Sequence, residues 1–267
     1  EAVALAESSD VVIVVLGGNE KTVREEFSRT DLNLPGRQEE LLRAVHATGK
    51  PVVLLLIDGR AATINWAAKY IPAIVHGWFP GEFMGDAVSQ VLFGDYNPGG
   101  KLAVTFPKSV GQIPYAFPFK PGADSKGKVR VDGALFPFGY GLSYTTFEYN
   151  NLKISQPKIG TQQDIQVSFT VKNTGSRDGD EVVQLYISDD QSSVTTYEKV
   201  LRGFDRIHLK KGKEKEIQFT ITPQDMGLWN KNNEFVVEPG TFTVMVGSSS
   251  QEIHLKETFE TLLHTNP

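Results

Sequence analysis

Two neighbouring carboxylates, Glu25 and Glu26, stand in a polar segment between an apolar run and an amphipathic helical pattern. Such a pair is a candidate for general acid/base chemistry, in which a carboxyl group gives up a proton in one step and accepts one in another. The preceding run, residues 11–16, is apolar without alternation, which is typical of a parallel strand covered on both faces. The pair is therefore expected on a loop at the carboxyl end of a strand, where open α/β sheets place their ligands. A solvated acidic loop would show the same local pattern.

The elements around this loop alternate between strand and helix up to about residue 141. A helix is expected over residues 36–48, strands over 51–57 and 73–78, and further helices near Trp66 and over 86–93. Alternation of this kind predicts βαβ units and a mostly parallel sheet.

After Tyr144 the spacing of the apolar residues changes from alternating helix and strand patterns to that of short strands alone. Short runs with apolar residues at every second position, such as 165–173, 181–189, 215–221 and 240–247, are separated by turn-forming sequences rich in Gly, Asn, Asp and Pro. About seven strands in this length predict an immunoglobulin-like β-sandwich. No aromatic row is apparent along its polar face, so the sandwich is expected to be structural rather than sugar-binding.

Three long motifs follow one another along the chain: "REEFSRTDLNLPGRQEELL" at 24–42, "GWFPGEFMGDAVSQVLFGDYNPGGKLAVTFP" at 77–107 and "LFPFGYGLSYTTF" at 135–147. They resemble glycoside hydrolase family 3, in which a glutamate precedes an arginine by four residues and an "LPG.Q" helix entry follows. Glu25 and Arg29 have that spacing. The resemblance implies that residues 1–144 are the family's C-terminal α/β sandwich domain, lacking its earliest strand or strands, and that residues 145–267 are a fibronectin type III-like domain.

The same resemblance implies a function. The chain resembles the C-terminal part of a retaining exo-acting β-glycosidase, most simply a β-glucosidase that hydrolyses terminal non-reducing β-D-glucosyl residues of a β-glucoside or oligosaccharide. Retaining hydrolysis needs a nucleophile and an acid/base about 5 Å apart. In the family the nucleophile is an aspartate on an N-terminal (β/α)8 barrel, which this chain does not contain, so the chain alone is expected to be inactive. A β-xylosidase of the same family, or a non-catalytic carbohydrate or subunit interaction module, are the alternatives.

The resemblance assigns roles to individual residues. Glu25 is the expected general acid/base because it precedes Arg29 by four residues. In the family's other pattern a phenylalanine directly follows the acid/base glutamate, and this pattern selects Glu26, which Phe27 follows. Arg29, Phe27 and Trp78 are expected to bind substrate. Trp78 follows a strand and suits either a sugar subsite or core packing.

Composition narrows the classes of partner. The formal charge of −5 argues against nucleic acid, no apolar run approaches a membrane span, and the five histidines show no metal spacing. The chain has no cysteine and is expected to need no metal or cofactor. It opens without a signal peptide and inside a helix–strand unit, so a longer parent chain is expected. The family resemblance implies a periplasmic or secreted protein and allows a homo-oligomer.

Overall fold

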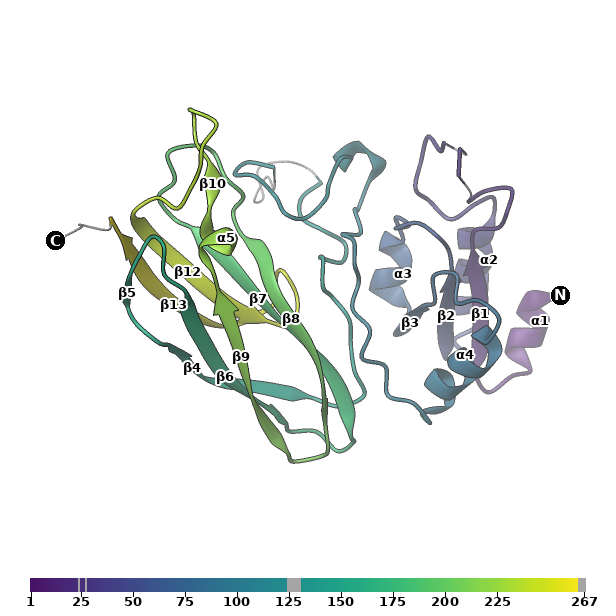
Figure 1. The fold of residues 1–267 in the computed structure, drawn as a ribbon. Coiled ribbons are helices and arrows are strands. Elements are labelled where there is room, and N and C mark those ends of the chain that lie inside the picture. Colours follow the sequence, from purple (N-terminus) through teal and green to yellow (C-terminus); the bar gives the residue numbers. More distant parts are fainter. Residues whose placement is uncertain (24, 27, 124–130, 264–267) are drawn as a thin grey trace. The chain divides into compact units, whose positions relative to one another are not determined.

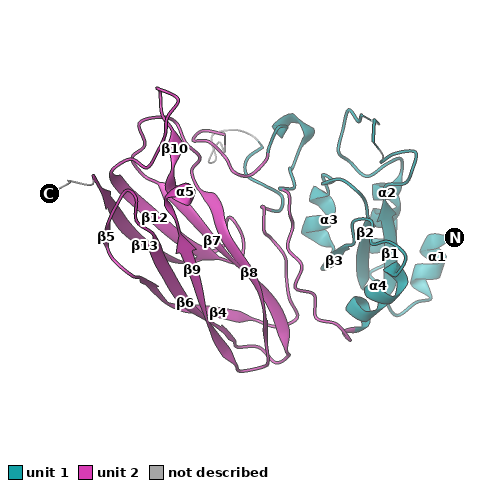
Figure 2. Ribbon diagram, viewed as in Figure 1, with its two compact units in different colours: residues 1–93, 105–115, 127–136 teal, residues 94–104, 116–126, 137–267 magenta. Residues whose placement is uncertain are grey.

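The structure is a computed structural model that describes residues 1–23, 25–26, 28–123 and 131–263. The chain forms two compact units whose segments interleave in the sequence (Figure 2). Unit 1 comprises residues 1–93, 105–115 and 127–136, and unit 2 comprises 94–104, 116–126 and 137–267. Within the described ranges no helix is both long and apolar enough to cross a membrane.

Unit 1 alternates helices and strands, as the sequence pattern predicts (Figure 1). Its elements are α1 (Ala2–Glu7), β1 (Val12–Gly17), α2 (Gln38–His46), β2 (Val52–Ile57), α3 (Asn65–Tyr70), β3 (Ala73–His76), α4 (Met84–Phe93) and the 3₁₀ turn η1 (Val110–Gln112).

The sheet of unit 1 is parallel throughout, in the order β1-β2-β3, with Val14 opposite Leu54 and Leu54 opposite Ile74. One face is packed. Its core joins strand residues to α1, α2 and α3 and comprises Ala6, Val14, Leu16, Leu34, Leu42, Val45, Val52, Leu54, Leu56, Ala62, Ile64, Ala67 and Ile71. The helices α2 and α3 therefore cover one face of the sheet.

The other face of the sheet carries less cover. Figure 1 draws α4 in front of the sheet, with α2 and α3 behind it, and α4 has no buried residue. Leu55 of β2 is buried, but Ile13 and Val15 of β1 are exposed. Ile13 and Val15 alternate with the buried Val14 and Leu16, so the face of β1 opposite the packed core is open to solvent.

Unit 2 is a β-sandwich (Figure 1). Its elements are β4 (Phe147–Ile154), β5 (Lys158–Gly160), β6 (Ile165–Asn173), β7 (Gly179–Asp189), β8 (Val200–Leu209), β9 (Glu214–Ile221), α5 (Pro223–Met226), β10 (Leu228–Trp229), β11 (Phe235–Val236), β12 (Gly240–Gly247) and β13 (Ile253–Leu262). One sheet has the order β5-β13-β12-β7-β8 and the other β4-β6-β9, while β10 and β11 form a short hairpin. Every pairing is antiparallel except that of the edge strand β5 with β13.

Alternate residues of the strands fill the sandwich core. Val167, Phe169 and Val171 of β6 are buried and face Val183, Leu185 and Ile187 of β7 in one apolar cluster. This period of two is what places one face of each strand inward. The predicted immunoglobulin-like sandwich is confirmed, and the strand bounds of β6 and β12 agree with the sequence pattern.

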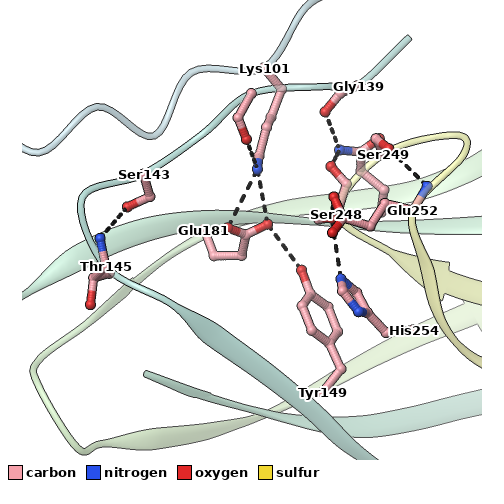
Figure 3. Close-up of polar contacts among 12 residues, drawn as sticks. Lys101, Gly139, Ser143, Thr145, Tyr149, Glu181, Ser248, Ser249, Glu252 and His254 are labelled. Atoms are coloured by element: carbon pink, nitrogen blue, oxygen red, sulfur yellow. Dashed lines mark hydrogen bonds and ion pairs between the residues drawn. The ribbon is translucent and has the colours of Figure 1, made fainter. Parts of the chain in front are cut away.

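A buried ion pair ties the segment before the sandwich to β7. Lys101 Nζ lies 3.2 Å from a Glu181 carboxylate oxygen and donates to the Gly141 carbonyl at 2.9 Å. Tyr149 donates to the same carboxylate at 3.0 Å, as Figure 3 shows. The side chains of Lys101 and Glu181 are only 10% and 4% exposed. Residues 94–104 therefore belong physically to the sandwich unit.

Candidate functional site

The candidate site lies at the carboxyl edge of the parallel sheet, where three loops leave β1, β2 and β3. The loop after β1 begins at Gly17, whose backbone has φ +134°. A Cβ there would lie 2.0 Å from the Ile57 carbonyl oxygen, so only glycine fits. Gln38, at the start of α2, holds the same point. Its side-chain oxygen accepts from the Gly17 N–H and its amide donates to the Gly17 carbonyl, both at 2.8 Å.

Val23 anchors the first half of the loop. It is buried and packs against two glycines. A Cβ added to Gly18 would lie 2.0 Å from one Val23 methyl group, and a Cβ added to Gly59 would lie 3.0 Å from the other. A turn precedes it, in which the Val23 N–H donates to the Asn19 carbonyl at 2.8 Å. The loop thus returns to the sheet edge two residues before Glu25.

Arg29 anchors the second half. Its guanidinium donates to Asp31 at 3.1 Å and to the Asn33 carbonyl at 2.8 Å, and its side chain is 16% exposed. Asn33 accepts from the Thr63 hydroxyl at 2.6 Å, which ties the loop to the segment after β2. These contacts give Arg29 a role in holding the loop, beside the substrate contact expected of it.

The two carboxylates stand between these anchors. Glu25 and Glu26 are both exposed, so either carboxylate is open to a group that approaches from outside the loop. Glu26 has φ +66°, a left-handed conformation that non-glycine residues seldom adopt, and it turns the chain directly after Glu25. Phe27, expected to bind substrate, lies outside the described residues. The exposed carboxylate pair is thus presented on a loop fixed at both ends.

Asp58 is a buried carboxyl group directly after β2. Its Oδ1 accepts from the Arg60 N–H at 3.2 Å, which closes a turn after β2. Burial raises the pKa of Asp58, while the backbone N–H groups of the turn and the charges of Arg29 and Arg60 oppose that shift. A Cβ on Gly18 would lie 3.1 Å from Asp58 Oδ1, so this carboxyl group adjoins the start of the acid/base loop.

The aromatic residues after β3 divide into a packed and an exposed one. Trp78, expected to line a sugar subsite or to pack, is half-buried. Its ring lies 4.4 Å from the His76 ring and 6.1 Å from Phe106. Phe79 is 55% exposed and lies over Gly59, where a Cβ would approach its ring to 2.6 Å. Phe79 and Val23 both lie against Gly59, so an exposed aromatic ring stands beside the anchored start of the loop.

The site can offer a carboxylate for proton transfer and an aromatic surface for an apolar face of a ligand. Among the residues outside the gaps at 24, 27, 124–130 and 264–267, no three His, Cys, Asp or Glu side chains gather as a metal site. Sequence reasoning missed Gln38 as the clamp of Gly17, although it stands in the "LPGRQ" motif. It also left out Val23, which no polar signal marks.

Comparisons with known proteins agree with this geometry. Residues 1–144 match the family model described as the glycosyl hydrolase family 3 C-terminal domain, and residues 181–250 match that of the fibronectin type III-like domain. A β-xylosidase of Formosa agariphila is 46% identical over 260 residues, which are 96% of this chain and 36% of the relative. A periplasmic β-glucosidase of Salmonella typhimurium is 39% identical over 95% of this chain and 34% of the relative.

A solved structure shows the same two units. The β-glucosidase of Erythrobacter marinus superimposes with a TM-score of 0.93 at 40% identity, over 97% of this chain and 35% of that one. The chain spans about a third of the length of the curated relatives it matches. Because the α/β unit with its anchored carboxylate loop and the sandwich that follows both match in sequence and in fold, this chain belongs to glycosyl hydrolase family 3.

Proposed function

We propose that this chain is the C-terminal part of a retaining exo-acting β-glycosidase, in which Glu25 is the general acid/base. The nucleophile is an aspartate on an N-terminal (β/α)8 barrel of the parent enzyme. In the first step Glu25 protonates the leaving glycosidic oxygen while the nucleophile attacks the anomeric carbon. In the second step Glu25 takes a proton from water as the water oxygen attacks the anomeric carbon. This attack breaks the bond to the nucleophile and releases the sugar.

One observation carries this proposal: an exposed carboxylate pair sits on a loop that is anchored at both ends to the carboxyl edge of the sheet. Gln38 and Val23 hold the start of the loop, and Arg29 holds its end. An acid/base that serves a nucleophile on another domain must project from its own domain and keep a defined position. The spacing of Glu25 to Arg29 favours Glu25 over its neighbour Glu26. Arg29, Phe27 and Trp78 remain our proposed substrate contacts. We propose Phe79 as a further one, a choice supported by its exposed ring beside Gly59.

The substrate is proposed to be a β-D-glucoside, with terminal non-reducing glucosyl residues as the units released. Relatives named as β-glucosidases support this choice. A β-xyloside is the second candidate, because a relative with 46% identity is named a β-xylosidase. The relative named as periplasmic supports a periplasmic or secreted location. We place the boundary between the two family domains at residues 144 and 145, supported by the family match to residues 1–144, although residues 94–104 and 137–144 of the first domain pack in the compact unit of the sandwich.

The test compares Glu25→Ala with Glu26→Ala in the full-length enzyme. Loss of general acid catalysis typically lowers the rate by ~10² to 10⁴. The loss in Glu25→Ala should be large for disaccharides and alkyl glycosides, whose leaving groups need a proton, and small in the first step for a dinitrophenyl glycoside. Glu26→Ala is the matched control, because it removes an adjacent exposed carboxylate.

The result separates three readings of the loop. A leaving-group-dependent loss in Glu25→Ala alone supports the proposal. The same loss in Glu26→Ala alone moves the acid/base to Glu26. Normal disaccharide hydrolysis by both variants rejects an acid/base on this loop. Parallel assays with aryl β-D-glucoside and aryl β-D-xyloside decide between the two substrates.

A further inference from the structure

Unit 2 contains a cavity of about 380 Å³ beside the β10–β11 hairpin, at the end of the sandwich labelled β10 in Figure 1. This volume lies in the range of roughly 300–1,000 Å³ typical of small-molecule sites. None of the described residues of the acid/base loop lines the cavity. It is therefore a candidate binding site separate from the one proposed above.

The cavity has an apolar floor and an aromatic rim. Buried Ile187, Met226 and Phe242 form part of its lining. Trp229 and Tyr197, at the same cavity, are 65% and 44% exposed. Exposed aromatic rings beside a hollow offer flat apolar faces that a ligand is able to cover.

A carboxylate in the lining has unused hydrogen-bonding capacity. Asp189 Oδ1 accepts from the Gln191 N–H at 3.1 Å. Its Oδ2 is buried and has no hydrogen-bond partner among the described residues. Buried polar atoms normally have a partner, and an unpaired one costs free energy. Burial, with the nearby charges of Glu238 and Asp190, raises the pKa of this carboxyl group. A ligand hydroxyl group that reached Oδ2 would supply the missing partner, as donor to the carboxylate or as acceptor from the carboxylic acid.

We propose that this cavity binds a sugar unit of an oligosaccharide. A pyranose ring has an apolar face that packs on an aromatic ring and hydroxyl groups that donate to a carboxylate, and the cavity offers both partners in Trp229 and Asp189. Arg202 and Thr196 also line it and add polar partners for further hydroxyl groups. A purely apolar ligand would leave Asp189 Oδ2 without a partner.

This proposal departs from the expectation that the sandwich is structural only. The sequence shows no aromatic row because the two rings do not share a strand. Tyr197 lies in the connection before β8, and Trp229 lies in the short hairpin after α5. Folding brings them to one cavity. The proposal does not depend on the role of Glu25.

The test is calorimetric titration of the full chain with cellotetraose and, separately, xylotetraose. We expect saturable binding of at least one of them. Trp229→Ala should weaken it about two- to tenfold, the range expected when an aromatic contact is lost. Asp189→Asn should weaken it about tenfold or more, because hydrogen bonds to a charged carboxylate contribute more than those to a neutral amide.

Three controls make the result decisive. Phe204→Ala removes an aromatic ring of similar exposure, 68%, that does not line the cavity, and should bind as the parent does. Glu25→Ala should also bind unchanged, which separates this site from the acid/base loop. Tyr197→Ala is a second rim variant in case Trp229→Ala lowers the folded fraction, which circular dichroism would show. Binding of neither oligosaccharide, or binding that both rim variants leave unchanged, would overturn the proposal.

Discussion

Replacing Lys101 with Met should destabilise unit 2 through the carboxylate it leaves behind. Glu181 is 4% exposed and, among the described side chains, keeps only the Tyr149 hydroxyl as a partner once Lys101 is gone. Removing one member of a buried ion pair typically costs about 3–5 kcal/mol, because the remaining charge is uncompensated. The double variant Lys101→Met/Glu181→Gln removes that charge and should recover at least half of the loss, since a glutamine amide can still accept from Tyr149.

The effect should depend on pH in a defined direction. Burial is the main cause of the raised pKa of Glu181, and Lys101 and Tyr149 oppose it. Without Lys101 the folded-state pKa rises further above its unfolded value. A carboxyl group of this kind contributes stability that is present below its unfolded pKa and lost as pH rises through its folded pKa. The cost of Lys101→Met should therefore be smaller near pH 4, about the unfolded pKa of a glutamate, than at pH 7.

Urea unfolding followed by Trp229 fluorescence measures both effects. Trp66 and Trp78, the other two tryptophans, are replaced by Phe so that the signal reports unit 2 alone. The reasoning is refuted if the single variant loses less than about 1 kcal/mol at pH 7, or if the double variant is no more stable than the single one. A larger loss at pH 4 than at pH 7 would contradict the sign of the linkage.

Two further predictions follow from the loop and from the proposed division of the active site. Gly17→Ala should lower the free energy of unfolding of unit 1 by several kcal/mol, because its Cβ would lie 2.0 Å from the Ile57 carbonyl oxygen at a backbone φ that alanine disfavours. Gly49→Ala is the matched control, because Gly49 also has a positive φ but open space around it. Equal losses of stability in the two variants would contradict the steric argument. The 267-residue chain alone should not hydrolyse a dinitrophenyl glucoside, because retaining hydrolysis also needs the nucleophile that we place on the barrel; measurable turnover by the pure chain would reject that placement.

The sequence predicts the strands well where burial produces a simple pattern of apolar residues, either a continuous run or strict alternation. The run at β2 and the alternation along β6 place their strands within one residue. It identifies β8 and β13 less clearly, because most of their residues are exposed and their apolar positions alternate weakly. The short strands β5, β10 and β11 have too few residues for any period to show.

The sequence predicts which residues of the candidate site could do chemistry, but not the contacts that hold them in place. Glu25 and Arg29 stand out by type and spacing, and the structure places both on one loop. The contact of Val23 with Gly59 and the pairing of Gln38 with Gly17 depend on tertiary packing, which no local pattern contains. Both side chains are exposed, so the choice of Glu25 over Glu26 rests on the sequence spacing to Arg29 alone.

Azide rescue of Glu25→Ala in the full-length enzyme tests the central claim most directly. With dinitrophenyl β-D-glucoside the first step needs little acid assistance, so the covalent intermediate should accumulate for lack of a general base. Azide needs no general base and should restore turnover, giving a glucosyl azide of retained β configuration in the NMR spectrum. If azide instead rescues Glu26→Ala while Glu25→Ala hydrolyses disaccharides normally, or if it gives an α-glucosyl azide, the role assigned to Glu25 is wrong.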